Sequence, residues 1–395
     1  MNRGAERHAA LDHIRGLSIL GILIVNAISF AQPMDVYADP ARSPVPMTAA
    51  DGLALWFIDT FAHGKFITLF SLLFGVSVFL VGETGETPLR RRLVWLTVFG
   101  LIHGVVIWHG DVLLLYAVAG LVFMQWRDRP ARWLCLTGLG LYLVTAAALI
   151  AIYSLSRFMP TGLELPPRDP GFIGLMRSGF WGSLQGNGWQ WSQDIIAILI
   201  IYGPHTMGLM MLGLGLFKSG FLKGDSRAGL YVVAAVAGAI CLAVTGAVNA
   251  RYVANGYDAG GFSLIYDIVT LGLPLVISLG YAALLILLAR GVGGWLLYPL
   301  ACAGRMAFTN YLSQSLVMTA LFYGGRAPDG TVIFGYALPL FGTMNHAGLV
   351  PIVAAIWIVQ VLFSMLWLQI FRYGPFEWVW RCLTCRRWVS ILKPA

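Results

Sequence analysis

Residues 10–30, "ALDHIRGLSILGILIVNAISF", form an apolar run that opens with Asp12 and Arg15 and holds Asn26 in its interior. Because each residue of an α-helix turns the chain by about 100°, Arg15 and Asn26 lie about 20° apart on one face, and Asp12 lies within about 60° of both. At roughly 1.5 Å of rise per residue, Arg15 and Asn26 are separated by roughly 16 Å. The stretch therefore predicts a membrane-spanning helix that carries one polar stripe.

The rest of the chain is equally apolar. Of its 395 residues, 58% are hydrophobic and only 11% are charged, whereas soluble domains carry about 25% charged residues. Runs long enough to cross a hydrocarbon core of about 30 Å recur along the whole length. We therefore expect one all-α integral membrane domain over residues 1–395, a bundle of about ten transmembrane helices. The predicted spans are residues 14–31, 64–82, 93–109, 111–126, 133–153, 195–217, 229–249, 266–289, 306–323 and 348–370.

The basic residues predict the orientation of the bundle. With a cytoplasmic N-terminus, most of the 26 Lys and Arg residues fall in cytoplasmic segments, as the positive-inside rule requires. Both termini are then cytoplasmic and the number of spans is even. The net charge of +8 reflects this topology and contact with anionic membrane lipids, and it needs no nucleic-acid partner. A cleaved signal peptide is the competing interpretation of residues 1–32, but Asp12 and Asn26 fit badly in its apolar region.

Ionisable residues inside spans are candidate functional residues, because they are costly in a bilayer unless they face protein or water. In "GLIHGVVIWHGDVLLLYAVAG", residues 100–120, His103 lies about ten residues beyond the Arg90–Arg92 cluster, which is roughly 15 Å into the membrane. A histidine at that depth is bound to a partner or takes part in proton transfer. His109 and Asp111 form the tip of a tight outer hairpin, where we expect His109 to be exposed.

Two further spans begin with polar residues whose roles stay open. His63 and Lys65 lie at the outer edge of the second span, where a lysine either snorkels to the surface or contacts a substrate. Asn310 and Gln314, one helical turn apart, either bond across helices or line the same cavity as Asn26. Arg305 lies at the inner edge of their span.

The remaining polar and aromatic segments favour structural roles. Residues 154–194 predict a long outer loop, in which Trp181, Trp189 and Trp191 either anchor at the interface or cover a cavity. In the tail "GPFEWVWR", residues 374–381, Glu377 and Arg381 are spaced to pair on an interfacial helix. The five cysteines are scattered, and the lone CxxC of Cys382 and Cys385 lacks further ligands, so we expect no metal site.

Several motifs, in this order along the chain, resemble the YeiB-like family, whose C-terminal part is classed as domain of unknown function 418. They are "LDHIRGLSILGILIVN", "KFITLFSLLFG", "RRRLVWLTVFGLIHGVVIWHGDVLLLYA", "GRMAFTNYLSQS" and "YGPFEWVWR". The resemblance implies N-terminal helices with an LDxxRG motif over residues 1–153 and a C-terminal region of the domain-of-unknown-function type over residues 229–388. It also implies a multi-pass protein of the bacterial cytoplasmic (inner) membrane.

A more distant similarity concerns chemistry. Acyltransferase-3 proteins carry an arginine and a histidine with ten residues between them, and Arg15 and Asn26 share this spacing with asparagine replacing the histidine. The heparan-glucosaminide N-acetyltransferase family is similar, and pairs an arginine with an asparagine. The resemblance implies acyl transfer from cytoplasmic acyl-CoA to an extracytoplasmic glycan, lipid or small molecule. Acetyl-CoA is a candidate donor substrate, and no bound cofactor is implied.

The same resemblance implies roles for individual residues. His103, or failing that His63, would be the general base; Asn26 would stabilise the oxyanion; and Asp111 would orient a histidine or bind the acceptor. The donor would be held by Asp12, Arg15, Arg91 and Arg305, and the acceptor by Lys65, Asn310 and Gln314. Expected partners are membrane lipids and the acceptor, with homo-oligomers left open. The alternatives are a transporter or lipid exporter, with a path through Asp12, Arg15, His103 and Asp111, and a non-catalytic scaffold.

Overall fold

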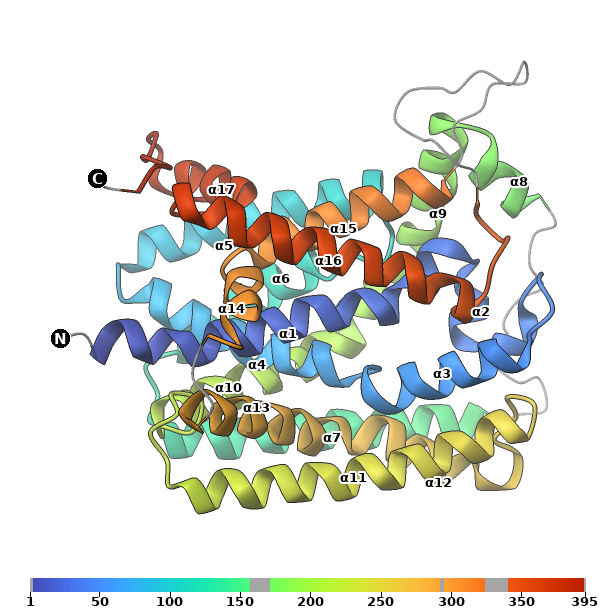
Figure 1. Cartoon of the computed structure of the whole chain (residues 1–395), viewed down its shortest axis with the longest axis horizontal. Helices are drawn as coiled ribbons and strands as arrows, with labels where there is room; N and C mark the ends of the chain where they lie inside the picture. The colour runs from blue at the N-terminus through green and yellow to red at the C-terminus, as the bar shows by residue number, and fades with distance from the viewer. Residues whose placement is uncertain (1–2, 157–170, 292–294, 324–339, 394–395) are drawn as a thin grey trace.

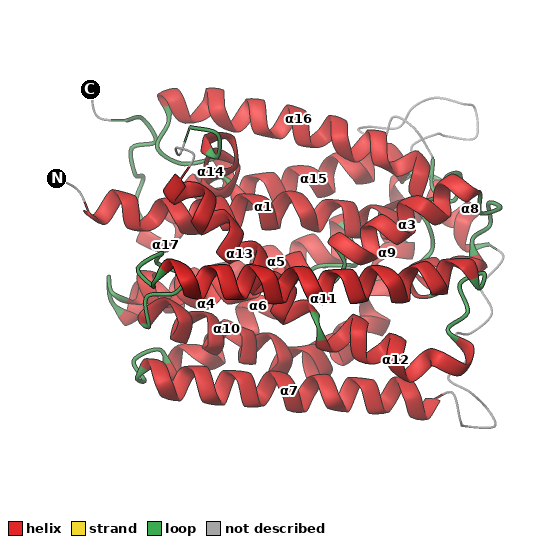
Figure 2. Ribbon diagram, turned by 60° about the horizontal axis from the view of Figure 1, so that its bottom comes forward, coloured by secondary structure: helices red, strands yellow, loops and turns green. Residues whose placement is uncertain are grey.

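The computed structural model describes residues 3–156, 171–291, 295–323 and 340–393. Within these ranges the chain is a bundle of helices, and the β-structure consists of a single isolated bridge between Phe371 and Leu392. The start of α1 and helix α17 lie at the same end of the bundle, and α8 lies at the opposite end (Figures 1 and 2). The all-α architecture predicted from the composition is confirmed.

The helices that build the bundle are α1 (Arg3–Ala31), α3 (Ala49–Phe61), α4 (Lys65–Gly82), α5 (Glu86–Ile102), α6 (Leu113–Phe123), α7 (Ala131–Ser156), α9 (Phe180–Ala197), α10 (Gly203–Lys218), α11 (Ala228–Ala254), α13 (Pro274–Gly291), α15 (Ala307–Phe322) and α16 (His346–Ile370). Shorter helices are α2 (Met34–Ala38), α8 (Phe172–Arg177), α12 (Ser263–Asp267), α14 (Tyr298–Arg305) and α17 (Pro375–Cys385). Three π-helical turns, η2 (His103–Ile107), η4 (Ile198–Tyr202) and η6 (Ile268–Gly272), and three 3₁₀ turns, η1 (Pro40–Arg42), η3 (Met124–Trp126) and η5 (Gly260–Phe262), complete the described elements.

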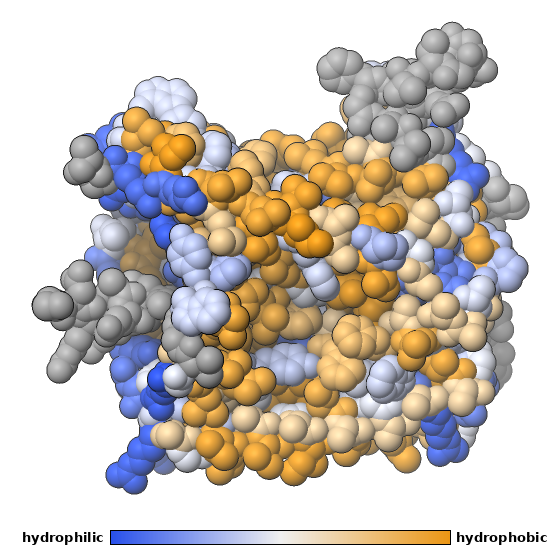
Figure 3. Space-filling view, viewed as in Figure 1, coloured by the Kyte–Doolittle hydropathy of each residue, from blue (hydrophilic) through white to orange (hydrophobic). Residues whose placement is uncertain are grey.

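Seven helical segments of the described chain are long and apolar enough to cross a membrane. An apolar band crosses the middle of the molecule, and hydrophilic residues gather towards its two ends (Figure 3). Helices α5, α6 and α15 overlap three further predicted spans, but each has fewer than 18 residues and none is among the seven. The protein is thus a multi-pass membrane protein, and the count of ten spans stays a prediction.

Close approach of helices explains the glycine of the LDxxRG motif. A Cβ atom on Gly16 of α1 would overlap the carbonyl of Leu300 in α14, and a Cβ atom on Gly304 of α14 would overlap the carbonyl of Asp12. Small residues let membrane helices pack backbone against backbone, where dispersion contacts replace the missing hydrophobic driving force. This crossing fixes the N-terminal half of α1, which carries Asp12 and Arg15, against α14.

The predicted outer loop of residues 154–194 is partly wrong. Helix α7 continues to Ser156, α8 and α9 cover much of the segment from residue 172 onward, and residues 157–170 lie outside the described part. Helix α9 was not predicted because its segment is rich in glycine and polar residues, a composition typical of loops. Its polar residues instead satisfy backbone groups of the neighbouring turn η2, since Asn187 donates to the carbonyls of Gly104 and Val105 at 2.9 and 2.8 Å.

Candidate active site

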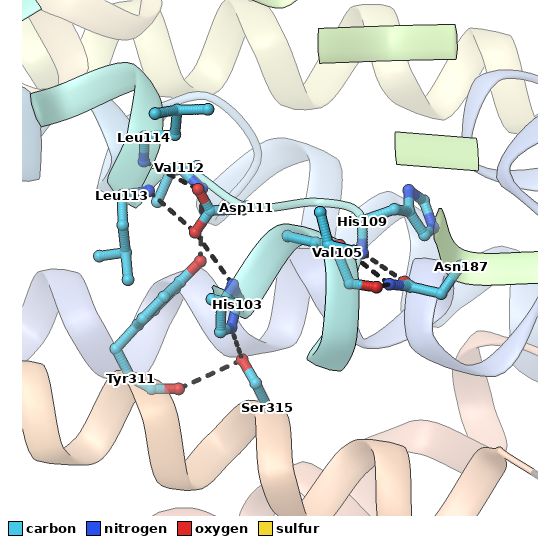
Figure 4. Close-up of polar contacts among 11 residues, drawn as sticks. His103, Val105, His109, Asp111, Val112, Leu113, Leu114, Asn187, Tyr311 and Ser315 are labelled. Carbon is cyan, nitrogen blue, oxygen red and sulfur yellow. Dashed lines mark hydrogen bonds and ion pairs between the residues drawn. The ribbon is translucent and has the colours of Figure 1, made fainter. Parts of the chain in front are cut away.

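His103 lies at the centre of a buried cluster of polar side chains. Its Nδ1 atom is 2.9 Å from Oδ1 of Asp111, and its Nε2 atom is 2.9 Å from Oγ of Ser315 (Figure 4). The contact with Asp111 is close in distance but lacks the alignment of a hydrogen bond. All three residues are at most 2% exposed. An acid, an imidazole and a hydroxyl in this order form the relay found in many serine hydrolases.

The local chain geometry explains how Asp111 reaches His103. Helix α5 ends at Ile102, and the π-helical turn η2 follows, closed by a bond from the Trp108 backbone N–H to the His103 carbonyl at 2.8 Å. The Asp111 carboxylate accepts the backbone N–H groups of Leu113 and Leu114 at 3.1 and 2.8 Å, at the start of α6. The positive end of the helix dipole favours a carboxylate at this position. Asp111 is therefore held by α6 and presented to the ring.

The hairpin tip itself differs from the prediction. His109 is buried instead of exposed, and its backbone N–H donates to Oδ1 of Asn187 in α9 at 2.6 Å. Asn187 thus bonds to both sides of the turn, and it was missed because nothing near residue 187 in the sequence refers to residues 104–109. Trp191, one turn further along α9, lies against Gly104. Of the three tryptophans in the predicted loop, Trp191 packs on the turn that follows His103, while Trp181 and Trp189 are exposed.

Aromatic rings enclose the rest of the cluster. The Tyr311 ring centroid lies 5.1 Å from that of His103, and Trp108 meets the imidazole edge-on at 6.3 Å. Trp108 in turn stacks on Phe30 of α1 at 4.0 Å. Asn26 is four residues from Phe30 and shares its face of the helix. The half-buried Asn26 therefore lies on the side of α1 that faces the His103 cluster, though the structure places neither side chain in contact with the other.

Arg15 lies at the end of the bundle where α1 begins and pairs with Asp12 at 2.8 Å. The charges of Arg15 and Arg92 in α5 are close enough to act on each other. Arg92 and His103 are separated by the same eleven helical steps as Arg15 and Asn26, so each pair lies on one helix face. Two helices thus place an arginine at one end of the bundle and a polar group roughly 16 Å deeper.

A groove of about 970 Å³ lies at this end, between the first turns of α5 and the chain from α17 to Trp388. Its charged lining includes Arg90, Arg91, Arg386 and Arg387, and its aromatic lining is Trp95, Trp378 and Trp388. None of these four arginines forms an ion pair with a carboxylate within the described ranges. Arg91 thus lines this groove, while Arg305 is exposed at the end of α14, directly after the Gly304 that packs on Asp12.

His63 belongs to a second, separate cluster. Its Nδ1 atom is 3.0 Å from Oδ1 of Asp59, and its Nε2 atom is 3.4 Å from the hydroxyl of Tyr37. The side chain of His63 is 47% exposed, in contrast to His103. Lys65 is buried and donates to the Asp59 carbonyl at 2.6 Å, so it does not snorkel. Both residues flank the junction between α3 and α4.

Asn310 and Gln314 lie on another face of α15 and join a network of amides. Gln314 donates to Gln360 of α16 at 2.9 Å, and Gln360 donates to the carbonyl of Asn310 at 2.9 Å. Asn310 also donates to Ser364 at 3.2 Å. These bonds connect α15 with α16 as packing contacts, the first of the two alternatives that the sequence left open.

Glu377 of α17 caps the start of α15 and thereby helps to place Ser315. Its carboxylate accepts the backbone N–H groups of Phe308 and Thr309 at 2.8 and 3.0 Å, and it also accepts the Thr309 hydroxyl. The expected pairing with Arg381 is absent from the described ion pairs. Burial raises the pKa of the Glu377 carboxyl, although the hydrogen bonds from Thr309 and Phe308 act in the opposite direction.

The described residues contain no group of three or more His, Cys, Asp and Glu side chains able to hold a metal ion. Cys382 and Cys385 are both free thiols. The groups that meet at the His103 cluster are an imidazole, a carboxylate and a hydroxyl.

Fold and site together define a multi-pass helical membrane protein with a titratable cluster buried between its helices. Residues 216–327 and 329–387 match the family described as protein of unknown function (DUF418). The chain is 31% identical to the uncharacterized protein YeiB of Escherichia coli, over 96% of this chain and 97% of that protein. It is 30% identical to the uncharacterized protein YxaH of Bacillus subtilis, over 98% and 96%. The chain belongs to the YeiB-like DUF418 family. No solved structure matches it.

Proposed function

We propose that this protein is an acyltransferase of the bacterial cytoplasmic membrane. It takes an acyl group from acyl-CoA on the cytoplasmic side, where both termini lie, and passes it to an extracytoplasmic glycan, lipid or small molecule. The observation that carries this proposal is the imidazole of His103, held between Asp111 and Ser315 inside the bundle. The relatives from Escherichia coli and Bacillus subtilis support the bacterial setting.

His103 fits the general base that acyl transfer requires. An imidazole ordinarily titrates near neutral pH, and proton transfer by a positioned side chain accelerates reactions by about 10²–10⁴-fold. The carboxylate of Asp111 favours a proton on Nδ1, which leaves Nε2 as the basic nitrogen. His63 has an equally close acid in Asp59, but its exposure and its position near the α3–α4 junction suit acceptor binding better.

The arginines at the opposite end suit the donor. Arginine forms paired, charge-assisted bonds to phosphate, and CoA carries three phosphate groups. Arg91 lies twelve residues before His103 on the same helical segment, or roughly 18 Å along its axis. The thiol sulfur of CoA is about 13 bonds from the nearest phosphorus, which is about 15 Å for an extended chain. Acyl-CoA whose nucleotide binds in the α5–α17 groove would therefore extend its thioester towards His103. Arg15 and Asn26 would act on it from α1.

Inverted membrane vesicles test the proposal, because they expose the cytoplasmic face to the donor. Vesicles containing the protein receive radiolabelled acetyl-CoA, and label is followed into lipid, glycan and small-molecule fractions. We expect labelling that depends on the protein and falls by about 10²-fold or more in His103→Gln. His205→Gln is the matched control, because His205 lies in another membrane helix and contacts only the Thr145 hydroxyl at 3.0 Å among side-chain bonds of the described chain.

One result would overturn acyl transfer, namely equal labelling with and without the protein when acetyl-, succinyl- and long-chain acyl-CoA are each supplied. Full labelling by His103→Gln would instead contradict the role of His103 as the general base. Proton-coupled movement of a solute across the same vesicles, with no acyl transfer, would instead favour the transporter hypothesis.

A further inference from the structure

Ser315 is the one residue of the buried cluster with a nucleophilic oxygen at the basic nitrogen of His103. Its Oγ atom lies 2.9 Å from Nε2, and it comes from α15, 212 positions away in the chain. Ser315 is only 2% exposed. We infer that Ser315 is a catalytic nucleophile that carries the acyl group as an ester between donor and acceptor. This inference rests on the proposed acyltransferase function and extends it.

The neighbours of the two His103 ring nitrogens, Asp111 at Nδ1 and Ser315 at Nε2, decide which group loses a proton. Asp111 is anchored by two backbone N–H groups of α6, so its charge stays beside Nδ1 and favours a proton there. Nε2 then accepts the hydroxyl proton of Ser315. The hydroxyl has an alternative acceptor in the Tyr311 carbonyl at 3.3 Å, but that bond is longer than the 2.9 Å contact with the ring.

The reaction proceeds in two balanced steps. The Ser315 oxygen attacks the thioester carbonyl while His103 takes the hydroxyl proton; the carbon–sulfur bond breaks, and CoA leaves with that proton as a free thiol. An ester between the acyl group and Ser315 Oγ remains. In the second step His103 removes a proton from the acceptor hydroxyl or amine, which attacks the ester carbonyl. The bond between the acyl carbon and Ser315 Oγ breaks, and His103 returns the proton to that oxygen.

An ester intermediate suits a reaction whose two substrates approach from opposite membrane faces. Ser315 is eight residues from the start of α15, so it lies roughly 12 Å along the helix, near its middle. Donor and acceptor would then visit the same atom in turn and need not be bound together. Burial beneath Tyr311 and Trp108 keeps water from the ester, which would otherwise be hydrolysed.

Ser313 provides the matched control within the same helix. Its hydroxyl donates to the Asn310 carbonyl at 3.0 Å and accepts from Gln360 at 2.8 Å, and among the described residues it has no hydrogen bond to an imidazole. Ser313→Ala and Ser315→Ala each remove one hydroxyl from α15. They differ in whether that hydroxyl faces His103.

The experiment uses the purified full-length protein in lipid nanodiscs with radiolabelled acetyl-CoA and no added acceptor. We expect label on the protein, mapped by mass spectrometry to the peptide containing Ser315, together with release of one CoA thiol per acetyl group bound. Ser315→Ala and His103→Gln should lose at least 90% of this label, and Ser313→Ala should retain it. Ser315→Cys should form a thioester, which neutral hydroxylamine cleaves while the wild-type ester survives, and this variant keeps the test valid if Ser315→Ala misfolds.

Distinct results separate the two proposals. If vesicles with Ser315→Ala transfer acetyl groups at the wild-type rate while His103→Gln is inactive, then His103 activates the acceptor directly and the nucleophile assignment is wrong. Label on any residue other than Ser315 would likewise show that the nucleophile assignment is wrong. If the wild-type protein neither binds label nor transfers it, the acyltransferase function itself fails.

Discussion

Helix α15 carries two polar faces that look alike in sequence and differ in chemistry. On one face Ser315 meets an imidazole and a carboxylate. On the other, Asn310 and Gln314 meet only amides and hydroxyls. Both sets are buried. The difference shows that burial of polar groups in a membrane protein does not by itself mark a site, since neutral amides can only hold helices together, whereas a titratable pair can move a proton.

The largest expected effect comes from removing the charge beside His103. Asp111→Asn should lower acetyl transfer by about 10²–10⁴-fold, because the amide no longer favours the Nδ1 proton. The fold should survive, since the side-chain oxygen of asparagine still accepts a backbone N–H group from the start of α6. Transfer is measured in inverted vesicles at equal protein content.

Asp128→Asn serves as the matched substitution, because Asp128 is 79% exposed and pairs only with its neighbour Arg127. A loss of activity of the same size in both variants would mean that Asp111 acts through general stability and not through His103.

An intermediate effect is expected at the donor groove. Arg91→Ala should raise the KM for acetyl-CoA about tenfold, a loss of about 1.4 kcal/mol typical of one charge-assisted bond, and leave kcat nearly unchanged. Arg132→Ala is the control, because Arg132 is an arginine at the same end of the molecule that does not line the groove. A fall in kcat with no change in KM would contradict donor binding by this groove.

A smaller effect, on stability and not on chemistry, is expected on the amide face of α15. Gln314→Leu removes the bond to Gln360 and should lower the free energy of unfolding by about 1 kcal/mol, since amide bonds between membrane helices are individually weak. Acetyl transfer should stay within a few-fold of wild type. If this variant is as inactive as His103→Gln, the contrast between the two faces of α15 does not hold.

The smallest effect concerns Glu377. The pKa of its carboxyl is raised on folding, so its protonated form is favoured in the folded state and the contribution to stability is complete below the unfolded pKa near 4.5. As pH rises through the raised folded pKa, that contribution is lost. The thermal midpoint should therefore decline over this window in the wild type, and the decline should be weaker in Glu377→Gln. Identical pH profiles would show that Glu377 does not titrate with a raised pKa.

The sequence indicated how far along its helix each polar residue lies, but not which side chains it contacts. Counting from Arg90–Arg92 identified His103 as a buried ionisable residue, and helical periodicity placed Arg15 and Asn26 on one face. The same counting put His109 at an exposed tip, which is wrong, because α9 folds over the turn and Asn187 bonds to it. The sequence offered no signal for Ser315. Three serines lie between residues 313 and 364, and no local pattern distinguishes Ser315 from the other two.

Hydrophobicity and helical period act along a single segment, and for that reason they were enough to establish an all-helical membrane protein, the location of most helices and the polar stripe of α1. The pairing of His103 with Ser315 joins residues 212 positions apart, and its geometry depends on how α5, α6 and α15 pack. No local pattern contains that information. "ALDHIRGLSILGILIVNAISF" thus predicts a membrane helix with polar residues. The acid, base and hydroxyl of the candidate site come together only through the packing of helices that are distant in the sequence.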